Sequence, residues 1–420
     1  MPSTLYLDAA RMGQMAPSAQ WALHDFVRLA GEEGCTLYFE QFLKSGFAAL
    51  PTRHQKRFTG LRCWGGLDEL KAALADFVGL SVGSRALIAG RSANLMKLIA
   101  KLLFQAGKRI LITDLTWPSY QRVLEREARK SAGEINRVHV RDAILRGTVS
   151  GAELVDLIVR MCGAGKCNGV FIPEVSHDGI RLPVAGIVAA LRQCDPALFV
   201  TLDGSQAFGH VPLNLTQTPC DFYLTGCHKW LGSHLPLGIG FLPNPATRAD
   251  IARRAAELVG RARLDDPLLA FLQSIETGRL RRFTETVNLS PLFSCRGALE
   301  DQFTDGPLAS RLRRRLANAN LVRRIARMTA WKPLTPMEEF RSASVLLQST
   351  SATVRKLGPD RLRSLFHDRG IALTSYAAGV VRLAMPSVPL STCQAGSLIQ
   401  ALALVQPHAS CRESGEALSA

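Results

Sequence analysis

The sequence lacks the features that define several broad classes of protein. Its ten cysteines include no C-x-x-C pair and no cysteine and histidine cluster at zinc spacing, so we expect no metal site. It has no run of about 18 apolar residues, so we expect no membrane-spanning helix. The first residues, MPSTLYLDAARMG, lack the basic and apolar regions of a secretory signal. These absences predict a soluble cytoplasmic protein with reduced thiols.

Acidic residues are scarce relative to basic ones. The 420 residues include 51 Lys and Arg against 35 Asp and Glu, a formal net charge of +16. Nucleic-acid surfaces need clustered basic residues, and clustering occurs only over 311–327, RLRRRLANANLVRRIAR. Apolar residues recur there at three- and four-residue steps, which predicts an amphipathic helix with most of its arginines on the other faces. Without a nucleic-acid-binding motif elsewhere, we expect no nucleic-acid partner.

Short apolar runs alternate with amphipathic stretches between about residues 85 and 243. The pattern predicts helices at 92–103 and 184–192, and strands at 85–90, 109–114, 169–174, 198–203, 222–226 and 238–243. This alternation is typical of an α/β layer with a largely parallel sheet. Beyond residue 292 the chain becomes arginine-rich and helical, and then predicts a strand pair over 372–386 and a helix near 394–405. We expect a second, smaller domain there.

Two residues with reactive side chains follow apolar strands within specific patterns. Asp203 ends one predicted strand and begins D-G-S-Q-x-x-G, and Lys229 follows another within T-G-C-H-K-W-L. Either residue alone after a strand is usually just solvated. The carboxyl ends of parallel strands meet at one edge of a sheet, where open α/β folds bind ligands. The sequence therefore predicts that the carboxylate and the amine share a ligand site.

These motifs resemble the class V aminotransferase family of pyridoxal-phosphate enzymes, which includes cysteine desulfurases and isopenicillin N epimerase-like members. The resemblance runs from about Tyr6 to Met385 and is strongest over 169–243. It implies an aspartate-aminotransferase-like α/β fold, in which a mostly parallel seven-stranded sheet flanked by helices forms a large domain and a smaller α+β domain follows. We expect three parts. An N-terminal segment at 1–30 packs with the small domain, the large domain comprises 31–292, and the small domain comprises 293–420.

The resemblance assigns roles to four residues of the expected site. Lys229 would form the internal aldimine with pyridoxal 5'-phosphate and then act as base and acid at the substrate α carbon. Asp203 would keep the pyridine nitrogen protonated, and Gln206 would hydrogen-bond the phenolic oxygen of the ring. His228 matches a position beside the cofactor phosphate, where a capping or packing role stays open beside a catalytic one.

Five further residues complete the cofactor site that the resemblance implies. Arg91 and Ser92 lie in a turn into a helix, which would offer backbone N–H groups and a hydroxyl to the phosphate. Trp117 matches the ring that stacks on the cofactor, and Ser176 lies near a polar cofactor contact. Thr286, in FTETVNLSP, matches a hydroxyl that reaches the phosphate of the neighbouring subunit. The resemblance therefore implies a homodimer with shared active sites.

The substrate and the reaction are less constrained than the cofactor. Arg382, in GVVRLAMP, matches the arginine that binds the substrate α-carboxylate, and Arg11 is a candidate for a second acidic group. No cysteine lies between Cys295 and Cys393, which disfavours a persulfide-forming cysteine desulfurase. We expect β-elimination, a carbon–sulfur lysis, of an amino acid or cysteine-derived conjugate. The alternatives are epimerisation, transamination, decarboxylation, a desulfurase with a rearranged loop, and a basic binding protein that kept the fold.

Overall fold

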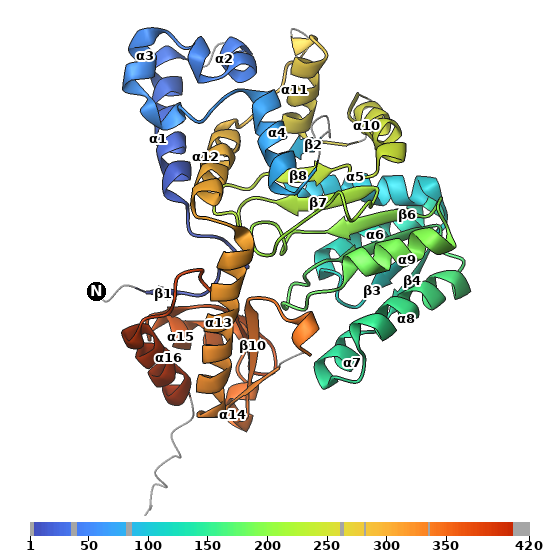
Figure 1. Cartoon of the computed structure of the whole chain (residues 1–420), viewed down its shortest axis with the longest axis vertical. Helices are drawn as coiled ribbons and strands as arrows, with labels where there is room; N and C mark the ends of the chain where they lie inside the picture. Colours follow the sequence, from blue (N-terminus) through green and yellow to red (C-terminus); the bar gives the residue numbers. More distant parts are fainter. Residues whose placement is uncertain are drawn as a thin grey trace, which may run out of the picture. The chain divides into compact units, whose positions relative to one another are not determined.

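The structure, a computed structural model, describes residues 4–34, 40–80, 86–260, 264–280, 283–334 and 337–405 (Figure 1). The chain divides into two compact units, which are described separately. The larger unit comprises Ala9–Arg313 and Pro336–Ser342. The smaller unit comprises Met1–Asp8, Arg314–Thr335 and Ala343–Ala420. The domain boundaries expected after residues 30 and 292 stay predictions.

The larger unit is built on a seven-stranded sheet in the order β2-β8-β7-β6-β5-β3-β4. Every neighbouring pair is parallel except the two made by β8, which runs antiparallel to β7 and β2. The strands are β2 (Ala86–Ala89), β3 (Arg109–Thr113), β4 (Glu134–Val138), β5 (Gly169–Pro173), β6 (Phe199–Asp203), β7 (Phe222–Gly226) and β8 (Gly238–Phe241). The expected mostly parallel sheet and all six predicted strands are confirmed, although Arg85 lies outside the described residues.

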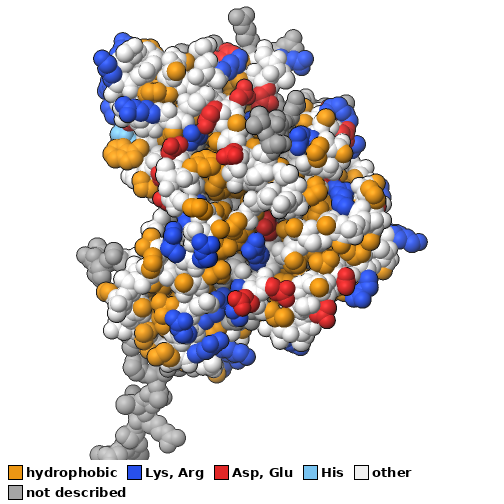
Figure 2. Space-filling model, in the orientation of Figure 1, with side chains coloured by type: hydrophobic (Ala, Val, Ile, Leu, Met, Phe, Trp, Pro, Cys, Tyr) orange, Lys and Arg blue, Asp and Glu red, His pale blue; other side chains and the backbone are white. Residues whose placement is uncertain are grey.

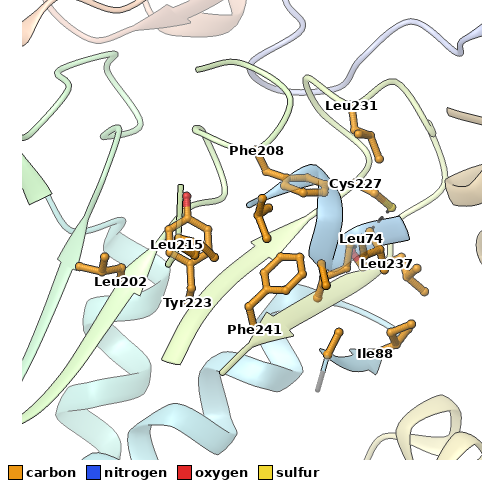
Figure 3. Close-up of a cluster of buried hydrophobic side chains, with 14 of the residues drawn as sticks. Leu74, Ile88, Leu202, Phe208, Leu215, Tyr223, Cys227, Leu231, Leu237 and Phe241 are labelled. Atoms are coloured by element: carbon orange, nitrogen blue, oxygen red, sulfur yellow. Dashed lines mark hydrogen bonds between the residues drawn. The ribbon is translucent and has the colours of Figure 1, made fainter. Parts of the chain in front are cut away.

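Side chains of the central strands alternate between two apolar cores, one on each face of the sheet. In β5, Val170 and Ile172 belong to one core and Phe171 to the other. Figure 3 shows part of the first core, where Tyr223 of β7 and Phe241 of β8 lie among leucine side chains. A strand buried on both faces reads as a continuous apolar run, which is why the sequence predicts these strands. The sequence does not predict strand β4, because β4 lies at the edge of the sheet and four of its five side chains, in EINRV, are exposed or half-exposed.

Helices cover the sheet of the larger unit on both faces. Those that contribute to the first core include α4, α8, α9 and α12, whereas α5, α6 and α10 contribute to the second. The helices and 3-10 turns are α1 (Pro17–Glu33), α2 (Glu40–Ser45), η2 (Phe47–Ala49), α3 (Thr52–Arg57), η3 (Thr59–Leu61), α4 (Leu67–Phe77), α5 (Ser92–Ala106), α6 (Pro118–Ser131), α7 (Arg141–Arg146), α8 (Gly151–Ala164), α9 (Val184–Cys194), α10 (Pro245–Gly260), α11 (Pro267–Glu276), α12 (Ser290–Thr304) and η5 (Glu338–Phe340). The predicted helices at 92–103 and 184–192 are confirmed as α5 and α9.

The smaller unit holds a four-stranded antiparallel sheet, β12-β13-β10-β9, and a parallel pair of β1 with β11. The predicted strand pair and final helix are confirmed as β12, β13 and α16. Its elements are β1 (Leu5–Tyr6), β9 (Trp331–Pro333), β10 (Ser344–Ser349), α14 (Ala352–Arg355), α15 (Pro359–His367), β11 (Ile371–Ala372), β12 (Thr374–Tyr376), β13 (Val380–Ala384) and α16 (Thr392–Leu404).

The arginine-rich stretch forms helix α13 (Leu308–Arg327), as its periodicity predicts. Four of its seven clustered arginines are exposed, but Arg311, Arg315 and Arg323 are buried, so a fully solvated basic face is wrong for these three. Arg311 donates to the side-chain oxygen of Gln302 at 2.5 Å and to its backbone carbonyl at 3.1 Å, which stabilises a buried guanidinium. On the face drawn in Figure 2, basic side chains are dispersed among acidic ones.

Within the described ranges, no helix combines the length and the apolar character that crossing a bilayer requires.

Candidate active site

The strand pairing brings three turns to one edge of the large sheet. Gly226, at the end of β7, pairs with Gly238, at the start of the antiparallel β8, and Gly238 also pairs with Ala89 at the end of β2. Asp203 ends β6 and pairs with Leu224 of β7. The turns after β2, β6 and β7 therefore share one edge, as their sequence positions predict.

Asp203 is a buried carboxylate at this edge. It accepts a hydrogen bond from the Ser205 backbone N–H at 2.9 Å. Burial raises the pKa of Asp203, and hydrogen bonds from Ser205 and the nearby Lys229 and His177 oppose this rise only in part. The structure thus places Asp203 within electrostatic reach of Lys229, the pair that the two strand ends predict. A buried carboxylate of this kind favours a cationic ligand group.

Gln206 lies one turn beyond Asp203 and its side-chain amide is engaged on both sides. Its Nε2 donates to the Ala10 carbonyl at 2.7 Å, and its Oε1 accepts from the indole N–H of Trp230 at 2.9 Å. Ala10 belongs to an N-terminal segment that lies against the lysine turn: the Gly13 N–H donates to the His228 carbonyl at 2.8 Å. This segment also carries the exposed Arg11.

Close packing of this N-terminal segment requires a glycine. A Cβ on Gly13 would lie 1.9 Å from the Lys229 carbonyl oxygen, a separation that no side chain tolerates. The absence of a side chain at Gly13 lets the backbone of residues 10–14 contact the backbone of Lys229. Arg11 is two residues from this contact, and its expected role toward a second acidic group of the substrate stays a prediction.

His228 lies between solvent and the protein interior, and its Nδ1 is a buried atom without a hydrogen-bond partner among the described residues. Burial, together with the neighbouring positive charges of Lys229, Arg91 and His234, lowers the pKa of His228 to about 4. The ring is therefore neutral near pH 7, with one ring nitrogen left for a ligand. A bound anion would satisfy it by accepting a hydrogen bond.

Because the pKa of His228 is lower in the folded protein than in the unfolded chain, the stability of the ligand-free protein should depend on pH. Below pH 6.5 the unfolded chain protonates His228 while the folded chain does not, so stability falls by roughly 1.4 kcal/mol per pH unit until about pH 4. We expect His228→Gln to flatten the fall in denaturation free energy between pH 6.5 and 4.5. His139→Gln, at an exposed histidine, is the control. Parallel pH profiles for wild type and His228→Gln would refute this assignment.

The turn after β2 is fixed by a buried acid that the sequence analysis did not single out. Asp266 accepts from the Gly90 N–H at 2.9 Å, from the Asn94 amide at 2.7 Å and from the Leu269 N–H at 2.8 Å, which also caps α11. Because Gly90 is engaged in this way, the expected anion-binding N–H groups are those of the first turn of α5, which begins at Ser92.

Tyr120 hydrogen-bonds the start of α5 and lies within electrostatic reach of the Asp203 carboxylate. Its hydroxyl donates to the Ser92 hydroxyl at 3.1 Å, and burial together with the charge of Asp203 raises the pKa of Tyr120. Arg91, the residue before α5, is exposed and takes an extended conformation. Both Arg91 and Ser92 therefore lie at the edge that carries Asp203 and Lys229.

The turns after β3 and β5 contribute two rings. Trp117 is 41% exposed and meets His177 edge-on, with ring centroids 5.1 Å apart and an interplanar angle of 67°. Ser176 is buried, and its hydroxyl donates to Asp178 at 2.5 Å and accepts from the Ile180 N–H at 3.0 Å. Ser176 thus holds its own turn, and its expected cofactor contact stays a prediction.

Two expected site residues do not belong to the turns described above. Thr286 is exposed in the segment before α12, where its role toward a partner subunit stays a prediction. Arg382, in the smaller unit, is buried: it donates to the Thr374 hydroxyl at 3.1 Å and lies 3.5 Å from the Asp8 carboxylate. Its guanidinium also lies over the Tyr376 ring at 6.0 Å. The sequence analysis identifies Arg382 but not its acidic partner Asp8, and the expected role of Arg382 toward the substrate stays a prediction.

The geometry fits a ligand with a flat cationic ring and an anionic group. Asp203 offers a buried negative charge, Trp117 an exposed aromatic face, and α5 a helix N-terminus beside the unsatisfied Nδ1 of His228. Across the described ranges, no three His, Cys, Asp or Glu side chains gather in a way that could hold a metal ion.

Comparisons with known proteins agree with this geometry. The family model for aminotransferase class-V matches residues 62–253. Isopenicillin N epimerase from Streptomyces clavuligerus is 28% identical over 176 residues, and an L-cysteine desulfhydrase-like protein from Epichloe uncinata is 22% identical over 198 residues. These matches cover 42% and 47% of this chain, and 42% and 40% of the relatives, so the chain matches less than half of either relative's length.

Solved structures match over nearly the whole chain. A cystine C-S lyase in complex with cysteine persulfide superposes with a TM-score of 0.68 at 16% identity, covering 96% of this chain and 97% of that one. A cysteine desulfurase from Escherichia coli gives a TM-score of 0.67 at 13% identity, covering 95% and 93%. At these identities the likeness shows the fold.

Proposed function

We propose that this chain is a carbon–sulfur lyase for an amino acid or cysteine-derived conjugate, because residues 62–253 match the family model for aminotransferase class-V, a family of enzymes whose cofactor is pyridoxal 5'-phosphate. The observation that carries the proposal is that the buried Asp203 and Lys229 follow strands that end at one edge of the sheet, where the lysine charge acts to lower the pKa of the carboxyl. A buried acid and an amine at this edge are the groups that the cofactor needs for its ring nitrogen and its point of attachment.

Each side chain of the site has its own proposed role. When bound, the cofactor withdraws electrons from the bonds at the substrate α carbon. Asp203 would hold a proton on the ring nitrogen, and the Lys229 amine would take the proton from the α carbon and give it to the leaving sulfur. Ser92 and the first turn of α5 bind the phosphate, with His228 Nδ1 beside them. Trp117 would offer its exposed aromatic ring to the cofactor.

Arg382 is proposed to bind the substrate carboxylate, and its contacts explain how it stays in place. Asp8 and Thr374 both contact its Nη2, which orients the guanidinium within an otherwise apolar strand. We also propose that the enzyme works as a homodimer to which Thr286 contributes across the subunit boundary.

The choice of lysis rests on the absence of a thiol. The described Cys393 is exposed in the first turn of α16, after β13, and the stretch from β11 to β13 contains no cysteine. Without a thiol before Arg382, sulfur transfer to the protein is disfavoured. In the proposed lysis the α proton is removed, the Cβ–S bond breaks and the sulfur leaves as a protonated thiol. The unsaturated amino acid that is left then takes up water to give pyruvate and ammonia.

Epimerisation is the second candidate, because two isopenicillin N epimerases, from Streptomyces clavuligerus and Amycolatopsis lactamdurans, match this chain. One incubation in deuterated water separates the two reactions. For lysis we expect release of thiol, pyruvate and ammonia from S-substituted cysteines. Deuterium at the α carbon of recovered substrate, without pyruvate, would instead establish epimerisation and reject lysis.

A further inference from the structure

The amide of Gln206 can take only one of its two orientations. An indole N–H only donates and a backbone carbonyl only accepts, so the contacts with Trp230 at 2.9 Å and with Ala10 at 2.7 Å assign oxygen and nitrogen unambiguously. Turning the amide over would place N–H against N–H and oxygen against oxygen. Because Gln206 is buried, water would not easily satisfy the atoms left without partners.

Trp230 is itself held firmly. Its ring is 4% exposed and stacks on His210, with centroids 3.8 Å apart and an interplanar angle of 14°. The His210 Nδ1 lies 2.7 Å from the backbone carbonyl of Gln206, which can only accept, so Nδ1 carries the proton. The indole is therefore tied to Gln206 through its own N–H and through the stacked histidine.

The consequence concerns the hydrogen atoms of the amide. Nε2 carries two, of which one reaches Ala10, while Oε1 receives the indole. The group that Gln206 can offer to a ligand is consequently the second N–H. In the opposite orientation it would offer oxygen lone pairs instead.

We propose that Trp230 is a positioning residue that holds Gln206 as a hydrogen-bond donor to the phenolic oxygen of the cofactor. This inference rests on the proposed function, because it requires a ligand with an oxygen anion at that place. It also gives a reason for the tryptophan directly after Lys229: the same turn that carries the amine fixes the donor on the neighbouring loop.

The test is the pH dependence of the visible absorbance of the holoenzyme. A donor at the phenolic oxygen stabilises its ionised form and lowers the apparent pKa of the absorbance change. Trp230→Phe removes only the indole nitrogen and part of the ring, so the amide loses one of the two contacts that fix its orientation and is held less firmly as a donor. We expect the midpoint to rise by about one pH unit, and the cofactor dissociation constant measured by reconstitution to rise about tenfold.

The titratable groups of the neighbouring turns are left in place by the substitution, whereas His210 loses the indole on which it stacks. Asp203 ends β6, His177 follows β5, and Lys229 and His228 follow β7. Trp64→Phe is the matched control: Trp64 is equally buried, and its indole donates to the Phe42 carbonyl at 3.0 Å away from these turns. The control should leave both the midpoint and the cofactor affinity unchanged.

A double-mutant cycle with Gln206→Ala tests whether Trp230 acts through Gln206. We expect Gln206→Ala alone to shift the midpoint, and Trp230→Phe to add almost nothing in that background. If Trp230→Phe does not fold, a benzothienyl analogue of tryptophan at position 230 removes the N–H and keeps the ring shape. Additive shifts, or an unshifted midpoint in an otherwise coloured holoenzyme, would overturn the inference alone. A wild-type protein that binds no cofactor would instead reject the proposed function.

Discussion

Replacing Lys229 with alanine is expected to abolish the visible absorbance of the protein incubated with pyridoxal 5'-phosphate and to lower turnover by at least about a thousandfold. Both effects have one cause, because the amine attaches the cofactor and also moves the substrate α proton, a step that positioned bases accelerate by about 10²–10⁴. Lys229 lies in the turn after β7, within electrostatic reach of the Asp203 carboxylate. The measurement is an absorbance spectrum with a turnover assay on the same samples.

The matched control for this prediction is Lys97→Ala. Lys97 is an exposed residue of α5, and its loss removes the same charge without touching the proposed site. The control should keep the spectrum and the turnover of the wild type. A Lys229→Ala protein that retained the visible band would show that another amine holds the cofactor.

Asp203→Asn is expected to separate activity from stability. Turnover should fall by at least about a hundredfold, since the amide cannot hold a proton on the ring nitrogen and fixed charges at reaction centres have effects of this size. The folded state raises the pKa of Asp203, mainly through burial, so at pH values above it the ionised carboxylate destabilises the cofactor-free protein. The variant should therefore melt at a higher temperature at pH 7, and this advantage should shrink as the pH falls and the wild-type carboxyl takes up its proton.

Asp221→Asn provides the opposite case. Asp221 is also buried, but it pairs with Arg192 at 2.6 Å and accepts hydrogen bonds from the amide of Asn244 and the Val200 N–H. Removing this charge leaves the partly buried guanidinium of Arg192 without its ion-pair partner, so the melting temperature should fall. If both variants lost stability at pH 7, the inference that Asp203 lacks a full counter-charge in the cofactor-free protein would be wrong.

The large sheet was predictable because its strands are buried on both faces. Runs such as RILITD and GVFIPE are short and almost wholly apolar, as expected of strands that are buried on both faces. Because these strands are parallel, the turns at their carboxyl ends lie at the same edge of the sheet. This is why Asp203 and Lys229 could be placed at one edge before any coordinates. The edge strand β4 was not predicted, because its exposed side chains are charged and interrupt the apolar run.

The residues that sequence reasoning missed act through long-range contacts. Asp266 reaches Gly90 across 176 positions, and Tyr120 reaches Ser92 from another helix. Neither residue belongs to a motif or a periodic pattern, so no local signal distinguishes them from ordinary cap and core residues. The buried Arg311 is similar, because the run of arginines around it predicts solvent exposure and only the position of Gln302 explains its burial.

The central claim is that Lys229 holds pyridoxal 5'-phosphate at the edge of the large sheet where the parallel strands end. Chemical trapping tests this claim most directly. Borohydride reduction of the holoenzyme fixes the cofactor to the lysine that carries it, and peptide mass mapping then identifies that residue. The account predicts one modified peptide, the one containing Lys229, with loss of the visible band on reduction. A modification confined to another lysine, or a protein that shows no band and no modified peptide after incubation with the cofactor, would contradict it.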